Sequence, residues 1–303
     1  MQTIHENKRK RSKGLSANAW SYVFIAPAMI GFFVFRAFPI GFAVWVSLTD
    51  WELIGPPPSF VGVQNYVQAF HDPVFGKAFA NTLAFTLMTA LGAALVGLIF
   101  AALLDRNIRG SKFFRTSLYV PVITPVVAVV RIWTWLYSPS PGGLFNWVAG
   151  LFGSGPYRWI MDPDMALPSL ALMTIWQGFG WDMVIILAGL KGIPNVFYEA
   201  ATVDGASWWD KFAHITLPLL RPVMLFVFIM GGINGFKTFA QPYLMQGPMN
   251  STLTTSLYIF QNAFDNFRMG YAAALSFIVS VVIMLLSVVQ FRAFGGEEGI
   301  SYE

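Results

Sequence analysis

Residues 79–104, FANTLAFTLMTALGAALVGLIFAALL, form an apolar run that contains no aspartate, glutamate, lysine or arginine. A helix needs roughly 20 predominantly apolar residues to cross the hydrocarbon core of a bilayer. Only a helix or a closed barrel pairs every backbone N–H and C=O group there, and an unpaired group is costly. The run therefore predicts a membrane-spanning helix.

Five other segments are long and apolar enough to cross a bilayer in the same way. They comprise residues 20–48, 113–137, 167–190, 217–240 and 270–291. The composition agrees, because 56% of the 303 residues are hydrophobic and 11% are charged, against roughly 25% charged in a soluble domain. We therefore expect an all-α membrane protein with six transmembrane helices. They form one domain, residues 20–292, between an N-terminal tail, residues 1–19, and a C-terminal tail, residues 293–303.

Lysine and arginine residues are distributed unequally over the two ends of these spans. Thirteen of them lie in the N-terminal tail, in the connections around residues 105–116 and 191–221, and at Arg292. The opposite connections contain only Lys77, Arg158 and Arg268. Since basic loops are retained in the cytoplasm, the bias predicts that both termini and the 191–216 connection are cytoplasmic. The same placement accounts for the net charge of +4 without a nucleic-acid partner.

The connection between the fourth and fifth spans has the local features of two short helices. Asn195 is expected to be the N-cap of a helix over residues 196–203, and Asp204-Gly205 then supplies a turn. Ser207 with Asp210 three residues later predicts the capped start of a second helix. The sequence therefore predicts a helix, a turn and a helix at the membrane surface.

Within this connection, several residues recur at the spacing of a known motif. Glu-Ala-Ala is followed by glycine after three residues, by isoleucine after nine more, and by leucine-proline after one more. The residues are Glu199, Ala200, Ala201, Gly205, Ile215, Leu217 and Pro218. Chance would produce this pattern in a chain of this length on the order of once in 10⁵. The connection resembles the EAA loop of the permease subunits of binding-protein-dependent ABC importers.

This resemblance implies that the loop, about residues 191–218, couples the membrane domain to an ATP-hydrolysing subunit. Its short helix would fit a groove on that subunit. Ala200 and Ala201 would allow close approach, Glu199 would make a charge-assisted contact, and Asp204 with Gly205 would form the sharp turn. Movement of the loop would then shift the spans as rigid bodies and alternate access from the two sides.

Four further segments are similar to the sugar-uptake branch of that family, the relatives of maltose and glycerol-3-phosphate permeases. They are FIAP at residues 24–27, FVGVQNY at 60–66, LKGIP at 190–194 and Gly247-Pro248. The resemblance implies a sugar or sugar-like polyol as cargo and the inner membrane of a bacterium as location. It also implies three partners: a second homologous permease, a dimer of ATP-binding subunits and an extracytoplasmic solute-binding protein. ATP and Mg²⁺ would bind the ATPase, so no cofactor is expected in this chain.

Polar residues inside the predicted spans are candidates for cargo contact, because such groups are costly in lipid unless they are paired or line water. The resemblance points to the fourth-span group in particular. The candidates are Gln177, Gly178, Trp181 and Asp182 in the fourth span, Asn234, Phe236 and Lys237 in the fifth, and Arg131 in the third. The alternative is that these residues form interhelical hydrogen bonds or ion pairs, or extend toward the end of a helix.

Seven aromatic residues gather near the predicted outer ends of the spans: Trp51, Trp133, Trp135, Tyr137, Trp147, Tyr157 and Trp159. Tryptophan and tyrosine are enriched at membrane–water interfaces, so an aromatic belt is the first interpretation. The alternative is a docking surface or a sugar-stacking mouth.

Enzymatic function has no support in the sequence. There is no phosphate-binding loop of the Walker type, there are no cysteines, and the three histidines are far apart in the predicted topology. Two other transport functions stay open. An ion-coupled secondary transporter is disfavoured because Asp182 is the one clear acid within a span and no repeat is visible. An importer for a non-sugar solute such as glycerol 3-phosphate would suit Arg131 and Lys237.

Overall fold

The computed structural model describes residues 17–106, 109–140 and 143–294. Within these ranges the chain is helical, apart from loops and the two isolated bridges Thr49–Phe60 and Glu52–Arg268. The all-α prediction is therefore confirmed. Most of the predicted N-terminal tail, and nearly all of the C-terminal tail, lie outside the described residues.

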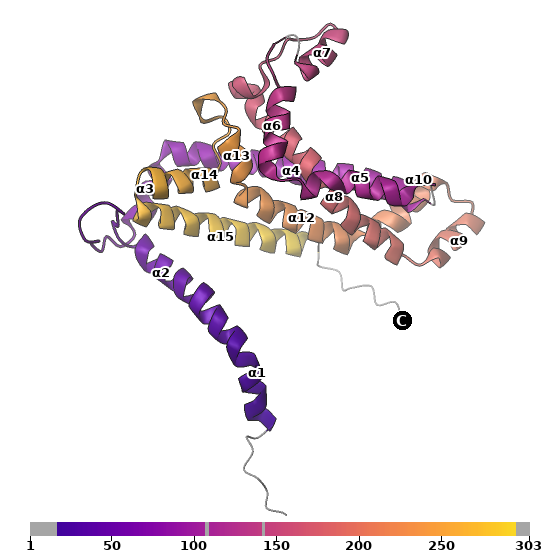
Figure 1. Cartoon of the computed structure of the whole chain (residues 1–303). Coiled ribbons are helices and arrows are strands. Elements are labelled where there is room, and N and C mark those ends of the chain that lie inside the picture. Colours follow the sequence, from indigo (N-terminus) through magenta and orange to yellow (C-terminus); the bar gives the residue numbers. More distant parts are fainter. Residues whose placement is uncertain (1–16, 107–108, 141–142, 295–303) are drawn as a thin grey trace, which may run out of the picture.

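The centre of the molecule is the pair of long helices α4 (Pro73–Asp105) and α8 (Pro163–Gly192), which lie along one another. Helix α12 (Arg221–Lys237) packs on α4, and α15 (Met269–Phe294) packs on α12 (Figure 1). Close contact within the central pair depends on Gly97, because a Cβ there would lie 2.9 Å from the backbone nitrogen of Met183. A small residue therefore lets the two backbones approach closely, as is common between membrane helices.

Both central helices begin with the same dipeptide, Asp-Pro. The Asp72 carboxylate accepts hydrogen bonds from the backbone N–H groups of Val74 and Phe75, at 2.9 and 3.2 Å. The Asp162 carboxylate does the same at the start of α8. Proline in the first turn costs nothing, because its missing N–H would have no partner within the helix. An aspartate at the N-cap also places a negative charge at the positive end of the helix dipole.

The third predicted span, residues 113–137, is not one straight helix. It consists of α5 (Ser111–Ile123) and α6 (Val126–Leu136), which are bent by 96° at Thr124-Pro125. Pro125 has no N–H to donate, and it disfavours helical geometry at Thr124, whose ψ is 131°. The described chain therefore has five helices long and apolar enough to cross a membrane, or six if the bent pair is one span.

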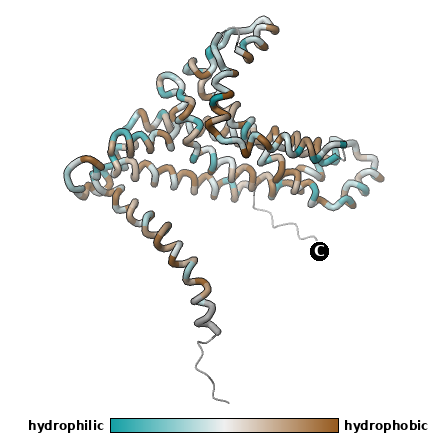
Figure 2. Tube along the Cα trace, viewed as in Figure 1, coloured by the Kyte–Doolittle hydropathy of each residue, from teal (hydrophilic) through white to brown (hydrophobic). Residues whose placement is uncertain are grey.

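The first span comprises α1 (Ala17–Phe32), the π-helical turn η1 (Phe33–Ala37) and α2 (Phe38–Ser47). It extends away from the other helices (Figure 1), and α2 approaches α15. Only 6% of its apolar window is buried within this chain, against 44% for the window in α8. Figure 2 shows hydrophobic residues along this exposed arm. Lipid or another protein chain must therefore cover most of it.

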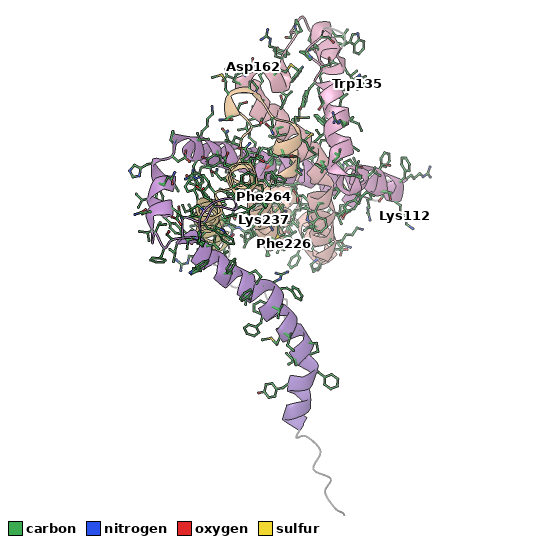
Figure 3. The ribbon with its side chains drawn as sticks, turned by 60° about the vertical axis from the view of Figure 1, so that its left-hand side comes forward. Lys112, Trp135, Asp162, Phe226, Lys237 and Phe264 are labelled. Atoms are coloured by element: carbon green, nitrogen blue, oxygen red, sulfur yellow. The ribbon has the colours of Figure 1, made fainter. Side chains whose placement is uncertain are left out.

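The predicted outer aromatic group is partly a packed core. Trp133 and Tyr137 are buried and contact one another. Both rings also contact Phe145 of α7 (Leu144–Leu151). In addition, Trp133 contacts Trp176, and Tyr137 contacts Trp159. These two rings do not face the membrane–water interface, as an aromatic belt would require, because they are buried against other rings in tilted and edge-to-face contacts. Trp135 is different: it is 66% exposed on α6, which projects from the body of the molecule (Figure 3).

Shorter helices connect the long ones. They are α3 (Gln64–His71), η2 (Trp159–Met161), α13 (Ala240–Leu244), η4 (Pro248–Asn250), α14 (Thr255–Phe260) and η5 (Gln261–Asp265). The Asp72 carboxylate joins three elements, because it accepts hydrogen bonds from the hydroxyls of Tyr258 on α14 and Tyr271 on α15, at 2.6 and 2.7 Å. We call this set of Asp72, Tyr258 and Tyr271 the aspartate node.

Candidate functional site

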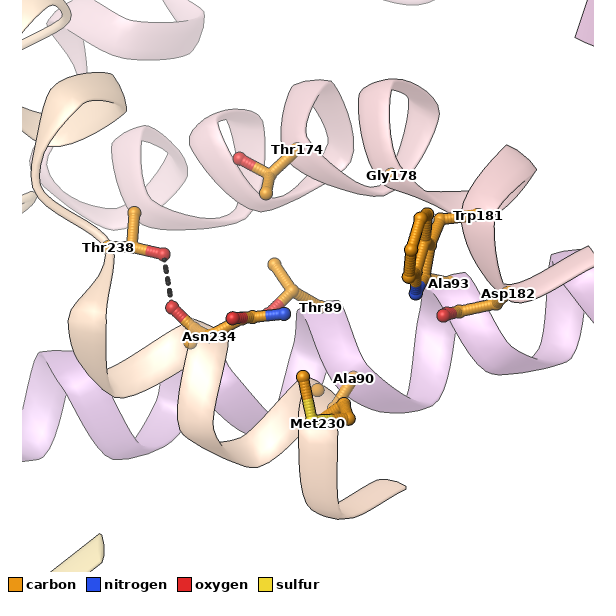
Figure 4. A pocket seen from close by; sticks show the side chains of 12 residues that line it. Thr89, Ala90, Ala93, Thr174, Gly178, Trp181, Asp182, Met230, Asn234 and Thr238 are labelled. Carbon is orange, nitrogen blue, oxygen red and sulfur yellow. Dashed lines mark hydrogen bonds between the residues drawn. The ribbon is translucent and has the colours of Figure 1, made fainter. Parts of the chain in front are cut away.

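A pocket of about 170 Å³ opens between α4, α8 and α12 (Figure 4). Its lining combines small and hydroxyl-bearing side chains with one indole, one amide and one carboxylate. The lining residues are Thr89, Ala90, Ala93, Thr174, Gly178, Trp181, Asp182, Met230, Gly231, Asn234, Gly235 and Thr238. We call it the central pocket.

The central pocket brings together four of the predicted cargo residues: Gly178, Trp181 and Asp182 from α8, and Asn234 from α12. Gly178 leaves backbone open to the pocket, because a Cβ there would meet no atom within 4 Å. The Asp182 carboxylate has no hydrogen-bond or ion-pair partner among the described residues. Such an unpaired acid within an apolar helix is a mark of a functional position.

Four other predicted residues do not line the central pocket. The Gln177 side-chain amide donates to the Thr124 carbonyl, at 3.4 Å, and so links α8 to the bend between α5 and α6. Phe236 is buried against α15. Arg131 and Lys237 are exposed, and neither is among the residues around the pocket.

Sequence reasoning missed the three threonines of the pocket, Thr89, Thr174 and Thr238. Each donates its hydroxyl hydrogen to the backbone carbonyl four residues earlier, at 2.8 to 2.9 Å. A threonine bonded in this way is tolerated in an apolar helix, so it gives no sign of function in the sequence. That the three hydroxyls line one pocket becomes visible only once α4, α8 and α12 are placed together.

The connection after α8 forms a helix, α9 (Asn195–Val203), a turn, and a shorter helix, α10 (Trp208–Lys211). Pro194, not Asn195, occupies the N-cap position of α9, and no side-chain cap is present. The expectation for Asn195 was wrong by one residue, because Pro194 already has the extended backbone, ψ 133°, that precedes a first helical turn. Gly205 has a φ of +76°, a conformation that glycine adopts at little cost, and it makes the turn.

A capping box begins α10, as the sequence predicts. The Ser207 hydroxyl accepts from the backbone N–H of Asp210 at 3.2 Å, and the Asp210 carboxylate accepts from the Ser207 N–H at 3.0 Å. Hydrogen bonds from the side chain and the backbone of Ser207 hold the pKa of the Asp210 carboxyl below its ordinary value. The charged carboxylate is therefore the form that stabilises this turn.

The loop is attached to the helical body at two places. The Tyr198 hydroxyl of α9 is 3.0 Å from the Thr216 hydroxyl of η3 (Phe212–Thr216), a π-helical turn that leads into α11 (Leu217–Leu219). The Arg106 guanidinium, just after α4, lies over the Trp208 ring at 5.6 Å from its centre. Thus α9 and α10 contact elements that continue into α12 and α4.

The residues of the EAA-like pattern lie along this path. Glu199, Ala200, Asp204 and Gly205 are exposed on α9 and the turn, and Ala201 is half-buried. Pro218 stands in α11, which continues directly from η3, because Thr216 at their junction also has helical backbone angles. The remaining two, Ile215 and Leu217, flank the buried Thr216, and Leu217 is exposed.

Neither site has the composition of a metal centre. Within the described residues, no three His, Cys, Asp or Glu side chains come close enough to hold a metal ion.

Comparisons with known proteins agree on one family. The model of "Binding-protein-dependent transport system inner membrane component" matches residues 93–293. The probable ABC transporter permease protein YesP of Bacillus subtilis (strain 168) is 35% identical, over 93% of this chain and 93% of its own length. The arabinooligosaccharides transport system permease protein AraP of the same organism is 31% identical, over 94% and 91%.

A solved structure has the same fold. One chain of a bacterial ABC transporter involved in the import of the acidic polysaccharide alginate superposes with a TM-score of 0.77. The match covers 92% of this chain and 96% of that one, at 22% sequence identity.

Proposed function

Because the chain belongs to the family of binding-protein-dependent transport system inner membrane components, we propose that it forms part of the pathway by which a sugar or similar polyol crosses the membrane. It is a multi-pass inner-membrane permease subunit of an ABC importer, and ATP hydrolysis belongs to a separate subunit. This membership sets aside the ion-coupled secondary transporter. The central pocket is the observation that carries the cargo proposal.

A sugar suits the central pocket chemically. Trp181 is 46% exposed and offers an aromatic face, and aromatic rings pack well on the apolar faces of sugar rings. Asn234 and three threonine hydroxyls supply polar atoms around it. Ligand sites typically combine such an apolar wall with a few well-placed polar groups. The relative AraP, named for arabinooligosaccharides, supports the same class of cargo.

The proposed topology places both termini and the 191–218 loop in the cytoplasm. The support is the excess of lysine and arginine on that side, with residues 20–292 as one membrane domain between short tails. In this orientation the aspartate node and α14 face outward, at the opposite end of the bundle from α9. The chain has no cysteine, so single cysteines can report the sidedness.

Labelling in spheroplasts tests this topology. Met249 is 76% exposed, and its carbonyl accepts a hydrogen bond from Lys77 near the start of α4. Val203 is 88% exposed and ends α9, in the loop that Arg106 contacts just after the end of α4. We expect a membrane-impermeant maleimide to label Met249→Cys in intact spheroplasts, and Val203→Cys only after permeabilisation. Labelling of Val203→Cys from outside would contradict the orientation.

For coupling, we propose that α9 docks in a groove of the ATPase and moves with it. Glu199, Ala200 and Ala201 would form the contact, with Asp204 and Gly205 as the turn. Movement would reach α8 directly, because Pro194 follows its last turn, and would reach α12 through Ile215, Leu217 and Pro218. A second permease would complete the pathway, and a solute-binding protein would deliver the cargo. Rigid-body rocking of packed helices is the usual form of such alternating access.

Transport in the assembled complex tests the cargo proposal. Trp181→Ala and Asn234→Ala should abolish uptake of the solute that the cognate binding protein carries, while the complex still assembles and hydrolyses ATP. Val184→Ala is the matched control, because Val184 is 43% exposed on α8 and does not line the central pocket. Unchanged uptake kinetics in the first two variants would show that cargo does not pass this pocket.

A further inference from the structure

The side chains of the central pocket offer more hydrogen-bond acceptors than donors. A threonine hydroxyl has one hydrogen to donate and lone pairs that accept. Thr89, Thr174 and Thr238 spend that hydrogen on backbone carbonyls of Phe85, Leu170 and Asn234. Figure 4 shows the Thr238 bond to the Asn234 backbone. All three side chains therefore present acceptors, and not donors, to the pocket.

The charges of the pocket have the same bias. Asp182 is the one acidic residue among the lining residues, and the lining includes no lysine, arginine or histidine. Arg131 and Lys237, the cations that would suit an anionic cargo, lie outside the lining. An ionised carboxylate repels an anion, and a protonated one supplies a single donor without any positive charge. Neither form provides the counter-charge that a desolvated anion requires.

Few groups in the pocket can donate a hydrogen bond to a solute. They are the Asn234 amide and the Trp181 indole N–H, since the backbone amides of α4, α8 and α12 are used within the helices. A carboxylate or phosphate accepts hydrogen bonds and offers none, so it would find two donors and at least four acceptors. A polyol has a donor on every hydroxyl and pairs with both kinds of group.

We infer that the central pocket selects uncharged, hydroxyl-rich solutes against anions, with Asp182 as the residue that sets this preference. The inference rests on the proposed function, whose cargo class it narrows to exclude sugar acids and sugar phosphates. It is independent of the fold, since a structure of the same fold comes from a transporter involved in importing an acidic polysaccharide. Charge selection is thus assigned to side chains of this pocket.

The absence of cysteine from the sequence makes the local charge measurable without knowledge of the cargo. Ala93→Cys places a single thiol in the pocket wall. In the purified complex, its reaction with cationic trimethylammonioethyl methanethiosulfonate is compared with its reaction with anionic sulfonatoethyl methanethiosulfonate. The ratio of the two rates, divided by the ratio for a free thiol in solution, reports the electrostatic preference of the pocket. Any effect on the reactivity of the thiol itself cancels in this ratio.

We expect a normalised ratio of about tenfold in favour of the cation, the size of effect that one charge within several ångströms produces at a partly shielded site. Adding Asp182→Asn should bring the ratio close to that of the free thiol. Met249→Cys is the control, because it is exposed elsewhere and Asp182→Asn should leave its ratio unchanged.

A ratio at or below that of the free thiol would overturn the inference, and so would a ratio that survives Asp182→Asn. If Ala93→Cys reacts with neither reagent, the same test uses Asn234→Cys, whose position is exposed. A lack of reaction at both positions would show that the pocket admits no solute, which also overturns the inference. A failure of the proposed function would look different. In that case the labelling ratio would still show the charge preference, but Trp181→Ala would leave uptake unchanged.

Discussion

Removal of the Asp72 carboxylate should destabilise the protein strongly, although Asp72 lies outside the central pocket. This side chain accepts four hydrogen bonds, two from the first turn of α4 and two from the hydroxyls of Tyr258 and Tyr271. It therefore fixes the start of α4 and holds α14 and α15 against it. Asp72→Ala removes all four bonds at once, and Asp72→Asn removes the charge while it keeps an oxygen that can cap the helix.

The magnitude follows from the separate contributions. Loss of an N-cap costs about 1 kcal/mol. A hydrogen bond to a charged group contributes roughly 1.5–3 kcal/mol, and the lower value applies here because Asp72 is half-exposed. We therefore expect Asp72→Ala to lower the free energy of unfolding by about 4 kcal/mol, and Tyr271→Phe by about 1.5 kcal/mol.

Unfolding of the purified protein by SDS in mixed micelles, followed by tryptophan fluorescence, would measure these differences. A double-mutant cycle of Asp72→Asn with Tyr271→Phe isolates the shared bond, and we expect a coupling of about 1 kcal/mol. Asp162→Ala is the matched control, because Asp162 caps α8 and accepts no tyrosine hydroxyl, so it should cost only about 1 kcal/mol. The reasoning is refuted if Asp72→Ala and Asp162→Ala are equally destabilising, or if the cycle is additive.

Three further outcomes are expected. Burial raises the pKa of Asp72, but the two tyrosine hydroxyls and two backbone amides outweigh it and hold the pKa below its ordinary value. The node should thus contribute fully above about pH 4 and lose its contribution as the pH falls further, so the stability difference between the wild type and Asp72→Asn should shrink in acid. Gly180→Leu should separate α5 from α8, because a Cβ at this position would lie 2.5 Å from the Leu118 carbonyl oxygen. We expect it to lower the free energy of unfolding by about 1–3 kcal/mol. Gly178→Ala, where a Cβ meets no atom within 4 Å, should alter uptake and not stability. Ser207→Ala should cost about 1 kcal/mol in local helix stability and reduce uptake per ATP hydrolysed, and Ser207→Thr should restore both.

Hydropathy located most of the helices well. The predicted span of residues 79–104 lies within α4, and that of residues 270–291 lies within α15. It failed at residues 113–137 because an average of apolar character carries no information about direction. The bend at Thr124-Pro125 is a local backbone effect, and Pro125 was the signal that could have revealed it.

Asp182 and Asn234 could be selected from the sequence because a polar group stands out in an apolar helix, whereas the family resemblance pointed to Gly178 and Trp181. Phe236 does not line the central pocket, and the geometry of a helix explains why. Successive residues turn by about 100°, so Asn234 and Phe236 face nearly opposite directions and cannot both line one pocket. The threonines could not be chosen from sequence, because only the packing of three helices decides which hydroxyls share a space.

The two Asp-Pro helix starts have a consequence for how the protein sits in its membrane. An apolar helix of the length of α4 exceeds the thickness of the hydrocarbon core, so its hydrophobicity alone would let it slide along its own axis. A charged cap at Asp72, and another at Asp162, must stay at the polar boundary. Since α4 and α8 are the central pair, the same two side chains set the depth of both, and with it the level at which the pocket between them opens.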